Sequence, residues 1–293
     1  MSKWSEHCNR RGINPHSADL KEIIHFLTDL FHAGLSYSAI NTAKSALSSI
    51  LQTDGNTTWG EHPMIKRFMK GVFNMRPQRP RYNYTWDVET VLRFLDNYHP
   101  LAEISLKILT LKTVTLTALV TGQRCQSIHL MDLKHMQQTE QKLRFVIEEK
   151  VKTSAPGKKQ PVLILPKFDM NEKRCVCATM IEYIRRTSAL RDGQSKVFIS
   201  YTKPHGQVTG STISRWIKTT LALAGIDTDI FKSHSTRSAS TSRASRQSLP
   251  LTSIMKAGAW RRDSTFRIFY NKPLDDESDF AMTILDHNTN KDE

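Results

Sequence analysis

Two short segments of the sequence each place an arginine where it could act on a phosphate ester. In Thr121-Gly-Gln-Arg124 the arginine follows a helix break at Gly122, and in His234-Ser-Thr-Arg237 an imidazole and a guanidinium stand three residues apart. Residues with this spacing lie on one face of a helical turn. Two guanidinium groups can clamp the non-bridging oxygens of a phosphate and stabilise the charge that builds up in the transition state. Arg124 and Arg237 are therefore candidate catalytic residues.

A group of aromatic residues near the carboxyl end contains a candidate nucleophile. Trp260 is followed by Phe266 and by Phe269-Tyr270. A tyrosine hydroxyl can attack a phosphate and form a covalent bond that keeps the energy of the broken linkage. Because a phenol ionises only near pH 10, it needs a base or strongly positive surroundings at neutral pH, and His234 is the candidate base. Taken singly, each of these residues also has an ordinary structural explanation, as a surface arginine, a structural histidine or a core aromatic.

The amino-terminal part of the chain is predicted to be helical. Apolar residues recur at helical spacing over 18–33, 38–51 and 65–73, so residues 1–75 are expected to form a helical domain, with no helix predicted before Ala18. The following segment, 76–84, is rich in proline and arginine and has no periodicity, which is typical of a linker.

The remainder, 85–293, is predicted to be a second domain of mixed structure. Helical patterns cover 88–95, 101–120 and 124–130, and they return from Cys175 onward, with a serine-rich helix starting at about Ser235. Between them, alternation over 143–147 and an apolar run over 162–165 predict an antiparallel hairpin. The expected fold is therefore mainly α with a small antiparallel β-sheet, an α+β class. The segment between the two strands contains four lysines: Lys150, Lys152, Lys158 and Lys159.

Composition narrows the class of partner. The 293 residues carry a formal net charge of +14, with 42 lysines and arginines spread over the whole length, which favours nucleic acid first and an acidic membrane surface second. No apolar run reaches the roughly 20 residues that span a bilayer, no amphipathic anchor is visible, and the start lacks a secretory signal. We therefore expect an intracellular protein without membrane contact.

Cysteine usage and motifs give no indication of a metal or cofactor. The four cysteines are expected to be reduced, and the spacing of Cys175 and Cys177 is not that of a zinc site. No phosphate-binding nucleotide loop and no tight carboxylate cluster is visible. The sequence thus predicts neither a metal nor a cofactor.

The order of the chemical residues resembles that of a known family. Arg124, the lysine segment, His234-x-x-Arg237, Trp260 and Tyr270, after a basic helical domain, resemble the tyrosine recombinase (phage-integrase-like) family over nearly the whole chain. The tryptophan before the tyrosine is similar to the Cre-type variant. The ending, with Ala257-Gly-Ala-Trp260, is similar to eukaryotic crypton and DIRS-type mobile-element recombinases. Trp260 and Tyr270 are one residue further apart than in the Cre-type pattern, and a longer turn at 261–264 is expected to absorb the difference.

The resemblance implies roles for the site residues. Tyr270 would form a 3′-phosphotyrosyl bond, and a lysine between the strands would protonate the leaving 5′-oxygen. Lys152 matches that position best, with Lys150, Lys158 and Lys159 as alternatives. Trp260 would donate a hydrogen bond to the phosphate and support the tyrosine by packing.

The resemblance also implies partners and an origin. The first domain would be a SAM-like core-binding domain that clamps double-stranded DNA together with the catalytic domain, within a tetramer on DNA. The expected phosphate contacts are Lys44, Lys66, Arg67, Lys70, Arg76, Arg79 and Arg81. The apolar tail segment 280–285 would dock on a neighbouring subunit or pack within its own. Because members often have a further helix before the one starting near Asp19, the chain is consistent with a piece of a longer mobile-element protein, which would be nuclear in a eukaryote.

Two alternative functions remain open from the sequence, and the first would keep the same fold. One is a catalytically inactive or domesticated DNA-binding protein, which the complete set of six chemical residues disfavours. The other is a type IB topoisomerase, which uses the same phosphotyrosyl chemistry as a monomer. The compact helical domain and the apolar tail favour a recombinase.

Overall fold

The computed structural model describes residues 2–51, 57–77, 82–152, 154–157, 160–260 and 263–274. The chain forms two compact units, Met1–Pro80 and Arg81–Glu293. The division between them lies inside the segment 76–84 that was predicted to be a linker. None of the helices in the described ranges is both long and apolar enough to span a bilayer.

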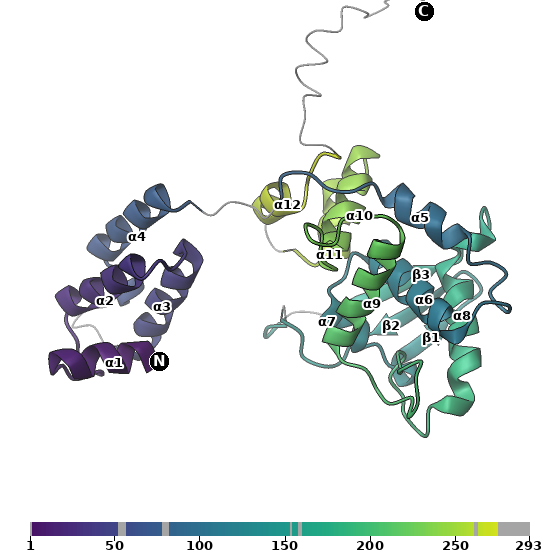
Figure 1. Cartoon of the computed structure of the whole chain (residues 1–293), viewed down its shortest axis with the longest axis horizontal. Helices are drawn as coiled ribbons and strands as arrows, with labels where there is room; N and C mark the ends of the chain where they lie inside the picture. Colours follow the sequence, from purple (N-terminus) through teal and green to yellow (C-terminus); the bar gives the residue numbers. More distant parts are fainter. Residues whose placement is uncertain are drawn as a thin grey trace, which may run out of the picture. The chain divides into compact units, whose positions relative to one another are not determined.

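The N-terminal unit is a helical bundle around one apolar core (Figure 1). Asp19 and Ser36 begin its second and third helices, because each side chain accepts a hydrogen bond from a backbone N–H three residues later. The core side chains Ile23, Leu27 and Ile40 are almost completely buried. The elements are α1 (Ser2–Arg11), α2 (Leu20–His32), α3 (Tyr37–Ile50), the 3-10 helix η1 (Trp59–Glu61) and α4 (Pro63–Met75).

Helix α1 was not predicted from the sequence. It precedes the first expected helix, and its Trp4 and Cys8 are buried in the core, with the indole N–H of Trp4 donating to the carbonyl oxygen of Pro15 at 2.9 Å. The expectation of no helix before Ala18 was therefore wrong. Only three residues of α1 are buried, and its polar majority hides the helical period.

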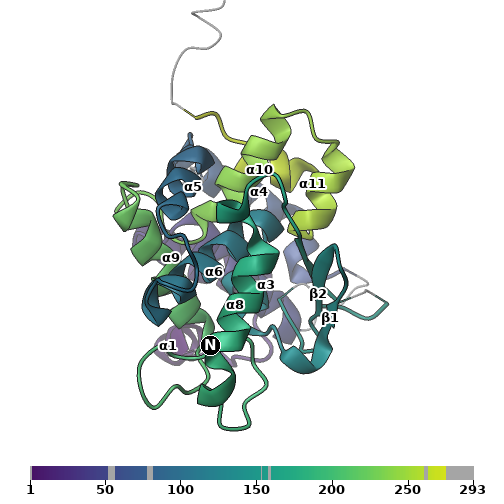
Figure 2. The ribbon, with the colours of Figure 1, turned by 90° about the vertical axis from the view of Figure 1, so that its right-hand side faces the viewer.

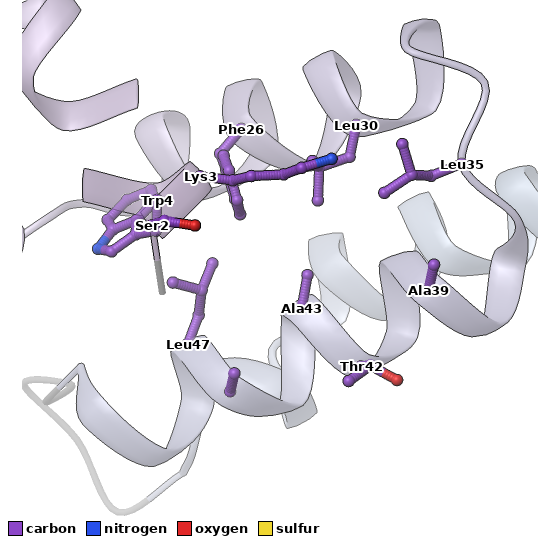
Figure 3. Close-up of a pocket in the computed structure, with 11 residues that line it drawn as sticks. Ser2, Lys3, Trp4, Phe26, Leu30, Leu35, Ala39, Thr42, Ala43 and Leu47 are labelled. Atoms are coloured by element: carbon purple, nitrogen blue, oxygen red, sulfur yellow. The ribbon is translucent and has the colours of Figure 1, made fainter. Parts of the chain in front are cut away.

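A hollow of about 370 Å³ opens between α1, α2 and α3 (Figure 3). Phe26 and Leu30 of α2 face Ala43 and Leu47 of α3 across it, and Trp4 of α1 lies at one end. None of the predicted site residues lines this hollow.

The C-terminal unit combines helices with one small sheet, which confirms the predicted fold class. The strands pair antiparallel in the order β1-β2-β3, with Phe145 opposite Leu163 and Leu143 opposite Leu165. The helices are α5 (Val88–Asp96), α6 (Leu106–Thr121), α7 (Cys125–His129), α8 (Val176–Thr187), α9 (Gly210–Leu223), α10 (Ser235–Arg246), α11 (Leu251–Gly258) and α12 (Asp263–Phe269). The strands are β1 (Met136–Gln138), β2 (Lys142–Val146) and β3 (Val162–Pro166), and 3-10 turns occupy η2 (Leu133–His135), η3 (Glu172–Arg174) and η4 (Ser188–Leu190).

Helix α6 forms the centre of the C-terminal unit. It contacts α8, α9, α10 and β3, and Figure 1 and Figure 2 both show it beside α8 and α9. The helix begins at Leu106 rather than at Leu101 as predicted, because the hydroxyl of Ser105 accepts a hydrogen bond from the N–H of Ile108 and starts the helix there. It ends at Gly122, whose φ of 58° turns the chain toward Arg124.

Lys112 lies in the middle of α6 and is fully buried. Its ammonium donates to the carbonyl oxygens of Leu95 and Tyr98, at 3.0 and 2.7 Å, and so satisfies acceptors at the end of α5. Burial lowers the pKa of Lys112 to about 8. The charge that interrupts the apolar run in the sequence therefore fastens α5 to the central helix.

Candidate active site

Helix α10 provides the first part of the site. His234 directly precedes the helix, and Arg237 lies in its first turn with only 1% of its surface exposed. The guanidinium donates to the carbonyl oxygen of Gly122, after α6, and at 2.8 Å to that of Gly258, at the end of α11. Arg237 thus joins the ends of three helices. Its Nε–H is buried and has no hydrogen-bond partner among the described residues.

Trp260 covers both Arg237 and Tyr270. The guanidinium carbon lies 4.6 Å from the indole centroid, and the rings of Trp260 and Tyr270 are 4.5 Å apart. Gly258 makes this packing possible, since a Cβ there would lie 1.8 Å from the indole ring. Ala259, with φ 52°, ends α11 and reverses the chain. Trp260 therefore supports the tyrosine by packing, while its buried indole N–H has no acceptor among the described residues.

Tyr270 lies directly after α12, with its phenolic oxygen 3.1 Å from Nε2 of His234. The guanidinium carbon of Arg237 is 5.4 Å from the centroid of the tyrosine ring. The approach to Tyr270 differs from the expected long turn at 261–264. Asp263 and Ser264 already belong to α12, and residues 261 and 262 lie outside the described residues.

Arg124 brings a second guanidinium to the site from α7. It precedes the first residue of this helix and is partly exposed. No described residue accepts a hydrogen bond from its side chain, in contrast to Arg237. Its positive charge is nevertheless near, because it lowers the pKa of both His234 and Arg237.

The electrostatics of the site keep the histidine neutral. Desolvation by the surrounding protein, followed by the charges of Arg237, Arg124 and Lys152, lowers the pKa of His234 to about 4, although part of the ring is exposed. Burial and Arg124 lower the pKa of Arg237 to about 10, so this group is still a cation at neutral pH. A neutral imidazole protonated on Nδ1 can accept the hydrogen bond of the phenol at Nε2. The imidazole of His234 can therefore act as a base toward the phenol of Tyr270, beside the positive charge of Arg237 and Arg124.

Lys152 lies on the segment between β2 and β3. Its side chain is exposed, and its backbone N–H donates to the amide oxygen of Gln126 in α7 at 3.1 Å. That contact holds the segment beside Arg124, and the lysine charge reaches His234. Lys150 is also exposed, while Lys158 and Lys159 lie outside the described residues.

The predicted DNA contacts belong to the N-terminal unit and the segment after it. Lys66, Arg67 and Lys70 are exposed on α4, whereas Lys44 is half-buried. Arg79 and Arg81 lie outside the described residues, as does the apolar tail segment 280–285.

Arg76 has contacts within its own unit. Its guanidinium donates to the carbonyl oxygens of Phe31 and Leu35, at 2.7 and 3.0 Å, and lies 3.9 Å from the Phe31 ring centroid. These contacts give it a structural role at the end of α2. A contact with phosphate stays a prediction for all seven residues.

Several residues that build the site were not singled out from the sequence. Gln123 donates to the carbonyl oxygen of Ala257 at 2.7 Å, and Trp86 donates to the hydroxyl of Ser235 at 2.8 Å. The backbone N–H of Thr85 donates to the carbonyl oxygen of Pro273 at 2.8 Å. The regular spacing of serines in α10 was a usable signal, but the partners of these residues are distant in sequence and could not be paired without the fold.

The cysteines have structural surroundings. All four are free, and Sγ of Cys175 accepts hydrogen bonds from the N–H groups of Phe168 and Ala178, at 3.3 and 3.4 Å. Within the described ranges, no group of three His, Cys, Asp or Glu side chains is placed to hold a metal ion.

Comparison with known structures relates this geometry to a family. The chain is similar to the XerH site-specific recombinase bound to a palindromic difH substrate in a post-cleavage complex, with 13% identity and a TM-score of 0.59, over 86% of this chain and 68% of that one. It is similar to the Tn1549 transposon integrase in complex with transposon right end DNA, with 14% identity and a TM-score of 0.55, over 92% and 93% of the two chains. It is also similar to a lambda integrase dimer bound to a COC′ core site, with 16% identity and a TM-score of 0.51, over 95% and 73%.

Sequence comparison gives the family directly. Curated proteins yield no match. The family described as "Phage integrase family" matches residues 86–276, a range that contains every residue from Arg124 to Tyr270 and covers more than half of the chain. The chain therefore belongs to the phage integrase family, the tyrosine recombinases.

Proposed function

We propose that this protein cuts and rejoins double-stranded DNA through a covalent bond between Tyr270 and a 3′-phosphate. The observation that carries the proposal is the 3.1 Å contact between the phenolic oxygen and Nε2 of a neutral His234, beside the cationic Arg237. Each phosphate of the DNA backbone is negative and repels an attacking nucleophile, which raises the barrier to cleavage. Arg124 and Arg237 remove this barrier by stabilising the charge of the pentacoordinate transition state.

The cleavage step balances within the site. The phenolic oxygen of Tyr270 forms a bond to phosphorus as its proton passes to Nε2 of His234, and the bond from phosphorus to the 5′-oxygen breaks. Lys152 gives a proton to the leaving 5′-oxygen. Rejoining runs the same steps in reverse, with a 5′-hydroxyl as the nucleophile, so no external energy source is needed.

DNA recognition is proposed to involve both units. The exposed cations of α4, Lys66, Arg67 and Lys70, are suited to contact phosphates, and each contact would make affinity fall with salt concentration. Several structural neighbours are DNA complexes, among them a lambda integrase tetramer bound to a Holliday junction. We propose the same kind of assembly, a homotetramer on DNA that carries out site-specific recombination for a mobile element, with a nuclear location in a eukaryote.

The test is covalent trapping on DNA. The full chain is incubated with a pool of nicked suicide duplexes of randomised sequence, whose cleaved strand diffuses away and leaves the adduct behind. We expect a denaturant-resistant protein–DNA band and a modified tryptic peptide that contains Tyr270. The Tyr270→Phe variant, which loses only one hydroxyl, is expected to bind DNA and to give no band.

The outcomes separate the competing functions. A band that persists in Tyr270→Phe would show that another residue is the nucleophile. DNA binding without a band in the wild-type chain would identify a catalytically inactive DNA-binding protein. Adduct formation with relaxation of supercoiled plasmid by a monomer, and no strand exchange, would identify a topoisomerase.

A further inference from the structure

Two serine hydroxyls of α10 point away from their own helix. Serine hydroxyls inside a helix commonly bond to the carbonyl oxygen four residues earlier, as Ser240 does with Thr236 at 2.9 Å. Ser238 and Ser242 instead donate to the carbonyl oxygen of Tyr270, at 3.3 and 2.6 Å. These two hydroxyls therefore hold the main chain of the residue that carries the phenol.

Ser242 holds the two peptide units that flank Asn271. Its side chain is fully buried, and its oxygen accepts a hydrogen bond of 2.9 Å from the N–H of Lys272 while donating to Tyr270. Arg246, one turn further along α10, donates to the carbonyl oxygen of Lys272 at 3.1 Å. The segment 270–272 is thus fixed along one face of α10.

The same helix carries the other reacting groups. His234 and Arg237 occupy its first turn, and they meet the side chain of Tyr270 while Ser238 and Ser242 hold its backbone. The proposed nucleophile Tyr270, the base His234 and the cation Arg237 are therefore all positioned by the same helix, α10. Helix α12, which leads to Tyr270, has only seven residues and buries only Phe266, so the bonds from α10 add to its support of Tyr270.

We propose that Ser238 and Ser242 are positioning residues, a hydroxyl clamp that holds Tyr270 on α10 in the orientation for in-line attack. The proposal rests on the function proposed above. Displacement of a reacting atom by about 1 Å can cost roughly a hundredfold in rate. Loss of the clamp should therefore slow the chemical step while leaving the DNA-binding surfaces unchanged.

The experiment compares Ser238→Ala/Ser242→Ala with Ser240→Ala in the full chain. Ser240 is the matched control because its hydroxyl bonds only within α10. Single-turnover cleavage of the nicked suicide duplex is measured at saturating DNA, and affinity is measured separately by fluorescence anisotropy. We expect the double variant to cleave tenfold to a hundredfold more slowly with unchanged affinity, and Ser240→Ala to match the wild type.

A second substrate distinguishes positioning of the nucleophile from other defects. A duplex with sulfur in place of the bridging 5′-oxygen has a leaving group that departs without a proton. We expect the rate of the double variant, divided by that of the wild type, to be equally low on the sulfur duplex and on the normal duplex. The lost hydroxyls orient the attacking oxygen of Tyr270, and the sulfur substitution changes only the leaving group. Recovery to the wild-type rate on the sulfur duplex would overturn the proposal, as would an unchanged rate on the normal duplex or an equal loss in Ser240→Ala.

Separate controls test whether the variants fold and whether the function proposed above is correct. If the double variant melts well below the wild type, Ser238→Ala is used instead, since it removes only the longer of the two bonds to Tyr270. A wild-type rate in a folded Ser238→Ala would then overturn the proposal of a two-serine clamp. Absence of any adduct in the wild-type chain would instead refute the proposed function itself.

Discussion

The two sides of the candidate site are built in different ways. On the α10 side, Arg237, Trp260 and Tyr270 are held by hydrogen bonds and ring packing to residues from three helix ends. On the α7 side, Arg124 and Lys152 present side chains for which no hydrogen bond to a described residue is found, close enough for their charges to act on His234. The polar groups of the α10 side are thus mostly bonded within the protein, whereas the cations of the α7 side are suited to bind a phosphate.

This difference has an electrostatic reason. Bringing three cations together is unfavourable in the free protein, so their attraction for a phosphate is strongest where no internal partner competes. Arg237 is tied to carbonyl oxygens because it is buried, and a buried charge must be hydrogen-bonded. Substitutions on the α10 side should therefore affect stability and activity together, and those on the α7 side should affect activity alone.

The largest effect is expected from Arg237→Ala. The change removes a buried cation and leaves the carbonyl oxygens of Gly122 and Gly258 without their donor. We expect a loss of roughly 3 kcal/mol in the free energy of unfolding, in addition to loss of cleavage. Urea denaturation measures the first and the suicide-duplex assay the second. A variant as stable as the wild type would contradict the expectation that substitutions on the α10 side affect stability as well as activity.

Arg124→Ala should separate chemistry from folding. We expect cleavage at saturating DNA to fall by roughly 10²- to 10³-fold, since one charge-stabilising donor is lost. The melting temperature should be equal to the wild-type value or slightly higher, because Arg124 opposes the charge of Arg237. A marked fall in melting temperature would show that the α7 side also supports the fold.

Lys152→Ala tests the assignment of the general acid. We expect about a hundredfold slower cleavage of a normal duplex, as is usual when acid catalysis is lost. The duplex with a sulfur leaving group should be cleaved at close to the wild-type rate. Lys150→Ala, on the same segment and equally exposed, is the matched control. The assignment would move to Lys150 if only that variant showed the rescue.

The smallest effect concerns the pH dependence of stability. Because the pKa of His234 in the folded chain is about 4, below its ordinary value near 6.5, the unfolded chain binds the proton more readily between these values. This contribution is therefore fully present above about pH 6.5 and is lost as the pH falls toward 4. We expect the melting temperature of His234→Gln to fall less steeply over that range. Parallel curves for the two proteins would contradict the lowered pKa.

The sequence was sufficient for the order of the chemical residues and for the fold class. Gly122 marks the end of α6 and Ser235 the start of α10, because helix ends and apolar periods are local properties of the chain. The pairing of Tyr270 with His234 was predicted from the need of a phenol for a base. Its geometry depends on α12, which the sequence analysis had taken in part for a turn.

The remaining features depend on partners that are distant in sequence. Lys112 looks like a solvated charge until α5 supplies its acceptors, and Gly258 looks like a flexible residue until Trp260 folds onto it. The hydrogen bonds of Arg76 to carbonyl oxygens at the end of α2 likewise could not be foreseen, while its contact with phosphate stays a prediction. In each case the sequence shows the residue, but its contact partner is known only once the chain is folded.

The hydrogen bond from Thr85 to the carbonyl oxygen of Pro273 has a mechanical consequence. It joins the first described residues after the linker to the segment three positions beyond Tyr270. Tyr82 and Tyr84 also pack against Phe231, so this hydrogen bond fastens the chain beyond Tyr270 to an anchored part of the C-terminal unit. The segment that follows Tyr270 is therefore fastened both to α10 and to the first residue after the linker.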